Sequence, residues 1–193
     1  MQVETTRLAD VLAFVPAPAR DARGFFTRTF DRHEFDAAVA SYCSGAAAQV
    51  TSASFVQDSQ SRSGRGVIRG MHGRSGRGEA KLVRCARGAV HDVLVDIRPQ
   101  SDTFGAQQAF LLDDVGFRHL YVPPGFLHGF QALSDAADVC YRIDREHDPD
   151  EDIGVAYDDP DLAIDWPLPV TVVSARDASA GAFAALVRSL RER

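Results

Sequence analysis

The sequence predicts an all-β sandwich or barrel, and three observations support that fold class. Short segments alternate apolar and polar residues with a period of two, which is typical of strands that bury one face. Proline and glycine separate these segments, as they do at turns. The chain has 193 residues, 45% of them hydrophobic, which is enough for one sizeable core. We therefore expect a single domain over residues 1–193, without a linker or an internal repeat.

Seven segments are predicted to be strands. In chain order they are residues 67–71, 81–86, 89–97, 109–112, 119–122, 129–132 and 139–143. The second and third form the strongest pair and are predicted to make a hairpin through Arg87-Gly88. In residues 89–97, Val93, Val95 and Ile97 share one face, whereas Asp92 and Asp96 lie on the other.

Two segments have helical spacing. Residues 32–40 form a short candidate, and the C-terminal segment places Phe183, Leu186, Val187 and Leu190 on one apolar stripe. Such a stripe is expected to dock the helix on the outside of the domain. Residues 61–66 and 73–78 are rich in Arg, Ser and Gly, and both are predicted to be mobile loops.

Composition excludes several classes of protein. The formal net charge of −6 argues against non-specific nucleic-acid binding but allows a local basic pocket. No apolar run reaches 18 residues, so no membrane span is expected, and the polar N-terminus does not resemble a signal peptide. Cys43, Cys85 and Cys140 are odd in number and widely spaced. We expect reduced thiols in a cytoplasmic protein.

Lys81 is the one lysine in a chain with 20 arginines. Arginine carries a permanently charged fork, whereas lysine carries a compact ammonium, and the two are not interchangeable. A position that keeps lysine against this preference suggests a need for the ammonium. The alternative is a surface lysine without a function.

His72 follows a predicted strand and precedes a glycine-rich segment, where a side chain can face a cavity. Histidine is the residue most easily used as a base near neutral pH, although most lone histidines are structural. Lys81 lies ten residues further on, so the two side chains could be neighbours on adjacent strands. A base beside a cation is the pair that enolate chemistry requires, because the cation stabilises the oxyanion.

His128 lies within Pro123-Pro124-Gly125-Phe126-Leu127-His128-Gly129-Phe130, which resembles the second motif of the cupin superfamily. In metal cupins this histidine is a ligand, and imidazoles with a carboxylate suit iron, manganese or nickel. The first cupin motif requires a second ligand two residues after its first histidine. Arg74 occupies that position, and arginine cannot bind a metal. We therefore expect no metal.

Tyr141 alternates onto one face of its predicted strand. Most such tyrosines belong to the core, and the functional alternative is a proton donor opposite a base. The sequence lacks the phosphate-binding loop of ATP sites, the glycine fingerprint of dinucleotide sites and the Gly-x-Ser-x-Gly nucleophile motif.

Nine segments in order resemble the dTDP-4-dehydrorhamnose 3,5-epimerase family, and they span roughly residues 10–180. They are Arg23-Gly24-Phe25-Phe26, Phe55-Val56-Gln57-Asp58, Gly66-Val67-Ile68-Arg69-Gly70-Met71-His72, Lys81-Leu82-Val83-Arg84, Asp92-Val93-Leu94-Val95-Asp96-Ile97-Arg98, Ser101-Asp102-Thr103-Phe104-Gly105, Pro123 to Phe130, Asp159-Pro160-Asp161-Leu162-Ala163-Ile164-Asp165-Trp166-Pro167 and Ser174-Ala175-Arg176-Asp177. The resemblance implies a cupin-like jelly roll and a homodimer that epimerises a dTDP-4-keto-6-deoxyhexose without a cofactor.

The resemblance also implies roles for individual residues. His72 corresponds to the catalytic base, Asp177 to its carboxylate partner, Lys81 to the cation beside the C4 carbonyl and Tyr141 to the proton donor on the opposite sugar face. The positions that correspond to substrate-binding residues are Arg23, Phe26, Gln57, Ser59, Arg69, His128, His147 and Arg176. The resemblance further implies a site shared across the dimer interface.

Three positions depart from the family pattern. Arg28 stands where an acidic residue is usual, Ser59 replaces an Asn, and His147 replaces a second substrate-facing Tyr. These departures leave open which sugar and nucleotide base are bound, and whether C3 and C5 are both inverted. A C3-only or C5-only epimerase is therefore an alternative. Two further alternatives are a metal-dependent cupin oxygenase or isomerase that uses His72, His91 or His128, and a non-catalytic sugar-nucleotide binding protein.

Overall fold

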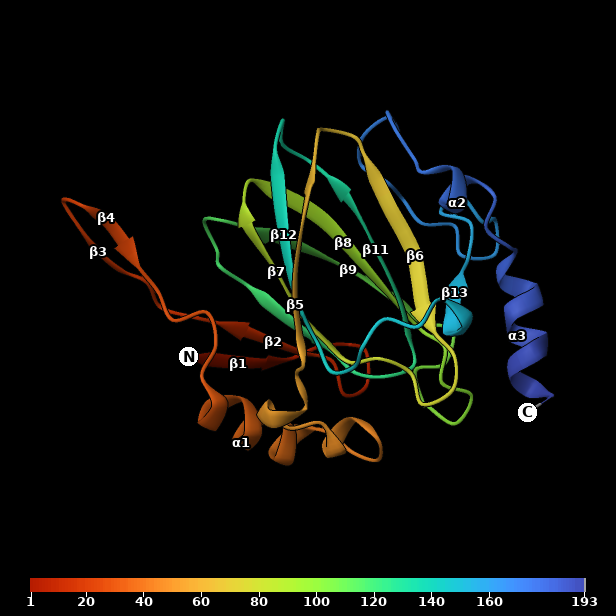
Figure 1. The fold of residues 1–193 in the computed structure, drawn as a ribbon, viewed down its shortest axis with the longest axis horizontal. Helices are drawn as coiled ribbons and strands as arrows, with labels where there is room; N and C mark the ends of the chain where they lie inside the picture. The colour runs from red at the N-terminus through yellow and green to blue at the C-terminus, as the bar shows by residue number, and fades with distance from the viewer. Residues whose placement is uncertain (193) are drawn as a thin grey trace.

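Two antiparallel sheets face each other in a sandwich, as the computed structural model in Figure 1 shows; it describes residues 1–192. The first sheet has the strand order β1-β2-β10-β7-β12-β5 and the second has the order β13-β6-β11-β8-β9. From β5 to β8, successive strands alternate between the two sheets, which is jelly-roll connectivity. The prediction of an all-β jelly roll is confirmed.

The strands of the first sheet are β1 (Gln2–Thr5), β2 (Leu12–Val15), β10 (His119–Val122), β7 (Lys81–Arg87), β12 (Ala137–Ile143) and β5 (Gln57–Ser63). Those of the second are β13 (Asp152–Gly154), β6 (Ile68–Arg74), β11 (Phe126–Ala132), β8 (Ala89–Asp96) and β9 (Gln107–Asp113). A separate hairpin consists of β3 (Ala19–Asp21) and β4 (Gly24–Phe26). The helices are α1 (Arg32–Tyr42), α2 (Ala175–Ala178) and α3 (Phe183–Arg191), with short 3-10 turns at Ala47–Gln49, Ser52–Ser54 and Pro149–Glu151.

The main core lies between the sheets. Val83 and Val139 from the first sheet meet Val90, Leu94 and Phe130 from the second, and all five are almost completely buried. Removal of this apolar surface from water provides the main driving force for closing the sandwich.

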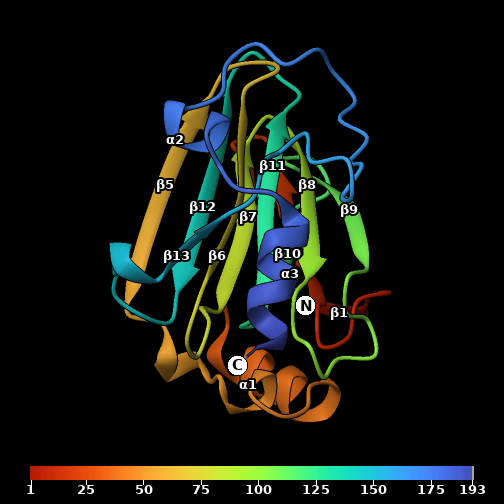
Figure 2. The same cartoon turned by 90° about the vertical axis from the view of Figure 1, so that its right-hand side faces the viewer.

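Both predicted helices form, and each covers an outer face. Asp31 caps α1 by accepting hydrogen bonds from the backbone N–H groups of His33 and Glu34, and α1 buries Phe35 against the first sheet. Helix α3 lies over the outer face of the second sheet (Figure 2), where its stripe contacts residues such as Val95. Because both faces of β8 are covered, Asp92 and Asp96 on its inner face are also buried.

The structure corrects three local predictions. Strands β7 and β8 are not a hydrogen-bonded hairpin, because Gly88 turns the chain from one sheet to the other. The predicted loop at 61–66 begins inside β5, and the one at 73–78 begins inside β6. In β5 the polar side chain of Ser61 lines a cavity, so composition alone indicated a loop there. Strands β1 to β5, strand β13 and helix α2 were not predicted.

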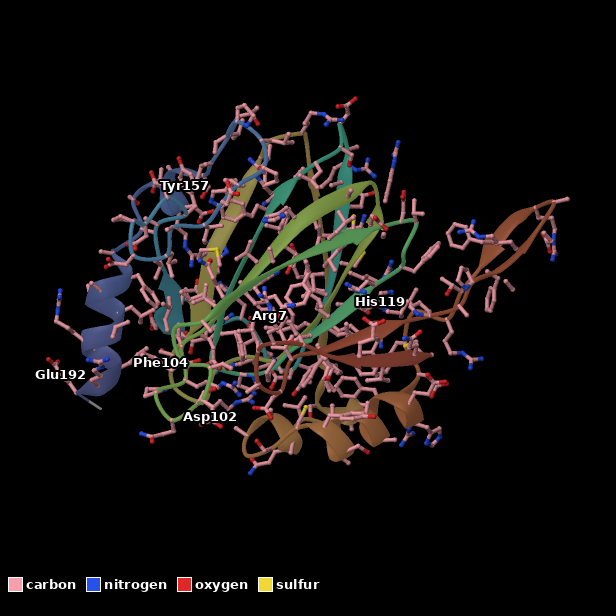
Figure 3. All side chains as sticks on the ribbon, turned by 180° about the vertical axis from the view of Figure 1, so that it is seen from behind. Arg7, Asp102, Phe104, His119, Tyr157 and Glu192 are labelled. Atoms are coloured by element: carbon pink, nitrogen blue, oxygen red, sulfur yellow. The ribbon has the colours of Figure 1, made fainter. Side chains whose placement is uncertain are left out.

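The β3–β4 hairpin extends away from the sandwich as an arm (Figure 1). Phe25 on this arm packs edge-on against Phe117, with ring centroids 4.9 Å apart. Figure 3 shows His119 where this arm meets the sandwich. Within residues 1–192, the helices are too short or too polar to cross a membrane.

Candidate active site

A cavity of about 690 Å³ opens between the two sheets. The second sheet contributes Arg69 and His72 from β6 and His128 from β11. The first sheet contributes Ser59 and Ser61 from β5, Lys81 from β7 and Tyr141 from β12. His147, Ser174, Arg176 and Asp177 add polar lining from the C-terminal part of the chain. The imidazole, the ammonium and the phenol therefore share one cavity.

His72 and Lys81 are not on adjacent strands, as the sequence had suggested. Strand β6 belongs to the second sheet and β7 to the first, so the two side chains approach the cavity from opposite walls. The crossing between sheets, which the local sequence pattern did not reveal, accounts for this difference.

His72 is hydrogen-bonded to a buried carboxylate. Its Nε2 lies 2.6 Å from Oδ1 of Asp177, whose other oxygen accepts the backbone N–H of Gly70 at 3.3 Å. Asp177 lies on α2, where its backbone N–H donates to Ser174 Oγ and anchors the turn. A carboxylate on Nε2 favours the tautomer with its proton there, which leaves Nδ1 free to accept a proton.

Burial lowers the pKa of His72, and the hydrogen bond and negative charge of Asp177 oppose that shift. The positive charges of Lys81 and Arg176 also lower the pKa. The net direction is downward, so the imidazole is neutral near neutral pH and able to act as a base.

A close contact between Gly70 and Gly129 lets β6 and β11 approach where His72 and His128 lie side by side. The two histidines are register partners across β6 and β11. Gly70 has a φ of +132°, and a Cβ on it would lie 2.5 Å from Gly129 Cα. Only glycine permits both this backbone conformation and so close an approach of the two strands.

His128 makes a second histidine–carboxylate pair. Its Nε2 lies 2.7 Å from Oδ2 of Asp92, which is completely buried on the inner face of β8. The ring centroids of His128 and Tyr141 are 6.2 Å apart, with an edge-on orientation. Asp92 thus fixes His128 beside the phenol.

Tyr141 extends from the first sheet, with its hydroxyl 3.2 Å from Ser61 Oγ. Burial raises the pKa of Tyr141, so its hydroxyl keeps its proton at neutral pH. It can therefore donate a proton from the wall opposite β6.

Arginine side chains supply positive charge around the cavity. Arg69 donates from Nε to Ser63 Oγ at 2.9 Å, and Arg176 pairs with Asp152 at 2.8 Å. Together with Lys81 they make the cavity locally basic in an acidic protein. Such a pocket suits an anionic ligand.

Three predicted binding residues lie outside the cavity lining. Arg23 and Phe26 are on the arm, where the Phe26 side chain is 74% exposed. Gln57 begins β5, below Ser59. Arg28, one of the departures from the family pattern, is also exposed and pairs with Asp31 at 3.3 Å.

Sequence reasoning missed several residues that build the site. Asp92 was given no role in the site, although a carboxylate between His91 and Val93 in a buried strand was an available signal. Glu79 lies 2.9 Å from the ammonium of Lys81 and precedes it by two residues. Arg74 was considered only as a residue that cannot bind metal. Within residues 1–192, no three His, Cys, Asp or Glu side chains are grouped to hold a metal ion.

The sequence matches the family model described as dTDP-4-dehydrorhamnose 3,5-epimerase over residues 5–185. A curated relative, the dTDP-4-dehydrorhamnose 3,5-epimerase of Escherichia coli, is 41% identical over 168 residues. That alignment covers 86% of this chain and 85% of the relative.

Solved structures agree with the sequence match. An epimerase from Mycobacterium tuberculosis superposes with a TM-score of 0.89 at 35% identity, covering 98% of this chain and 92% of that one. An epimerase from Legionella pneumophila, solved in complex with dTDP-4-keto-L-rhamnose, gives a TM-score of 0.84 at 36% identity, with 96% of both chains covered. The sandwich, the shared cavity and these similarities show that the chain belongs to the dTDP-4-dehydrorhamnose 3,5-epimerase family, whose fold is cupin-like.

Proposed function

We propose that this protein is an isomerase that epimerises a dTDP-4-keto-6-deoxyhexose at C3, at C5 or at both. One observation carries the proposal: a carboxylate-paired imidazole faces an ammonium and a phenol across a single cavity. In such a sugar, C3 and C5 both adjoin the C4 carbonyl, so their hydrogens are acidified. Every step of the reaction is then a proton transfer or the stabilisation of an oxyanion.

His72 is the base. Its neutral Nδ1 removes a proton from the carbon next to the ketone. The resulting imidazolium is stabilised by Asp177, which lies 2.6 Å from the other ring nitrogen. This arrangement follows the general rule that a base is oriented by a third group.

Lys81 stabilises the enolate. The negative charge that leaves the carbon appears on the C4 oxygen, where a compact ammonium can meet it. Its side chain is 16% exposed, so the interaction takes place in a partly dry site where charge pairing is stronger than in water.

Tyr141 returns a proton to the other face of the sugar. Strand β12 and strand β6 belong to facing sheets, and a planar enolate between them presents one face to each. Protonation from the β12 side inverts the carbon that lost its hydrogen to His72.

Basic and aromatic groups hold the nucleotide part of the substrate. The sugar and diphosphate are bound by four residues of the cavity lining: Arg69, His128, His147 and Arg176. Ser59, near Gln57 on the same strand, binds the nucleotide. Arg23 and Phe26 reach the site of a second copy in a homodimer. The exposed arm supports that assignment, because Phe26 makes little contact with its own chain.

The test is deuterium incorporation from heavy water into dTDP-4-keto-6-deoxyhexoses, followed by proton NMR. We expect exchange at one or both of C3 and C5, with the inverted carbon identified from the product. Exchange at both carbons supports a 3,5-epimerase, and exchange at one supports the C3-only or C5-only alternative. Folded protein that exchanges neither position would overturn the proposal.

A further inference from the structure

Two oppositely charged side chains are buried behind the wall that carries Lys81 and His147. Arg74 ends β6 and Glu79 precedes β7, and both side chains are only 6% exposed. Their charged groups lie 3.1 Å apart. Neither side chain lines the cavity, so neither can touch a substrate there.

Glu79 is held between two cations. One carboxylate oxygen lies 2.9 Å from Lys81 Nζ, and the other lies 3.1 Å from Arg74 Nε. Burying a carboxylate is costly unless it is paired, and removing one partner of a buried pair leaves the other charge uncompensated. The position of the Lys81 ammonium therefore depends on Glu79 and, through it, on Arg74.

Arg74 uses its remaining nitrogens elsewhere. Nη1 donates to the backbone oxygen of Asp148 at 2.6 Å, and Nη2 lies 2.7 Å from Nδ1 of His147. A guanidinium can only donate hydrogen bonds, so the ring nitrogen that faces it carries no proton. In the tautomer that accepts this hydrogen bond, the ring proton of His147 lies on Nε2, away from Arg74.

We propose that Arg74 and Glu79 are positioning residues that set the Lys81 ammonium and the His147 ring as one wall of the cavity. The inference rests on the proposed function, because it assigns Lys81 to the enolate oxygen. It adds two residues that act through others and that the sequence pattern did not indicate.

A double-mutant cycle on deuterium exchange tests the coupling. Glu79→Gln keeps the shape and removes the charge, so we expect kcat for exchange to fall by about 10- to 100-fold with KM changed less than about twofold. In a Lys81→Met background the same substitution should cost less than about twofold, since its target is already gone. Glu151→Gln is the matched control, because Glu151 pairs with Arg145 in the same region.

The single lysine allows a second readout that does not depend on turnover. Protein labelled with 13C and 15N lysine gives one set of side-chain resonances, all from Lys81. We expect the Cε and Nζ signals to move in Glu79→Gln and in Arg74→Gln, and to remain in place in Glu151→Gln. If Arg74→Gln fails to fold, the lysine signals of Glu79→Gln alone test the positioning role.

The outcomes separate the two proposals. Additive losses in the cycle, or unmoved lysine signals, overturn the positioning role while wild-type exchange still supports the epimerase. If Lys81→Met exchanges as fast as wild type, the role of Lys81 fails and the positioning role fails with it. Absence of exchange in the wild type overturns the epimerase, whereas the lysine signals still show whether Glu79 holds the ammonium.

Discussion

The cavity and the β3–β4 arm are built in opposite ways. In the cavity, six predicted residues from the two sheets converge on one space with His147, Arg176 and Asp177, and carboxylates fix His72 and His128 within it. On the arm, the Arg23 side chain is 90% exposed and pairs only with its neighbour Asp21. One chain thus brings the proposed proton-transfer groups together, whereas Arg23 and Phe26, the predicted nucleotide contacts of the arm, lie outside the cavity lining.

This difference suggests that the cavity carries out the reaction and that the arm contributes to substrate binding. Substitutions in the cavity should lower kcat, because they remove groups that act in the transition state. Substitutions on the arm should raise KM and should act on the site of another subunit. The predictions below test this division.

The largest effect is expected for His72→Asn. Asparagine keeps a polar side chain of similar reach but cannot take a proton, so exchange and epimerisation should both fall by about 10³-fold or more. Deuterium exchange measured with excess enzyme checks this loss, with circular dichroism as the control for folding. Retention of more than about a tenth of the wild-type rate would assign the base to another residue.

Tyr141→Phe should separate the two proton transfers. The ring still fills its place, but the hydroxyl that reprotonates the enolate is gone, so epimerisation should fall by about 10²-fold. Abstraction by His72 and return from the same face remain possible, and they place deuterium on carbon without inversion. Equal losses of exchange and inversion would show that Tyr141 is not the second proton donor.

The pH dependence should report the His72–Asp177 pair. Activity needs neutral His72, and burial lowers the pKa of His72, so the acid limb of kcat/KM should lie below the ordinary histidine value of about 6.5. Asp177 raises that pKa, so Asp177→Asn should move the limb further down while reducing kcat by roughly 10- to 100-fold. A limb that does not move would show that another group controls it.

The sequence predicted which residues line the cavity better than it predicted how the strands place them there. His72 and Tyr141 were singled out from their positions on predicted strands and from the family resemblance, and both line the cavity. The sequence did not predict that these residues lie on facing walls, because a strand pattern does not reveal to which sheet the strand belongs. The helix at residues 32–40 was predicted from its helical spacing, which is a local signal.

Other features were not predicted from the sequence because they depend on tertiary contacts. Polar residues in β5 resembled a loop since that edge strand faces a cavity and not a core. The pairing of Arg74 with Glu79 spans a turn between two sheets, and neither residue belongs to a recognisable motif. The arm strands are three residues long, too short for periodicity to detect.

The smallest effect, and the sharpest test of the comparison, is expected on the arm. The double variant Arg23→Ala, Phe26→Ala should raise KM by roughly 10-fold with kcat little changed, because it removes ground-state binding only. If the arm serves its partner, this variant and His72→Asn carry their defects in different sites of a mixed dimer. Random pairing then places both defects in one site and leaves the other intact, so about a quarter of all sites regain wild-type behaviour. We expect an equal mixture of the two proteins, refolded together, to show exchange with wild-type KM. A mixture that gives only the sum of its components would place the arm over its own cavity or away from any site.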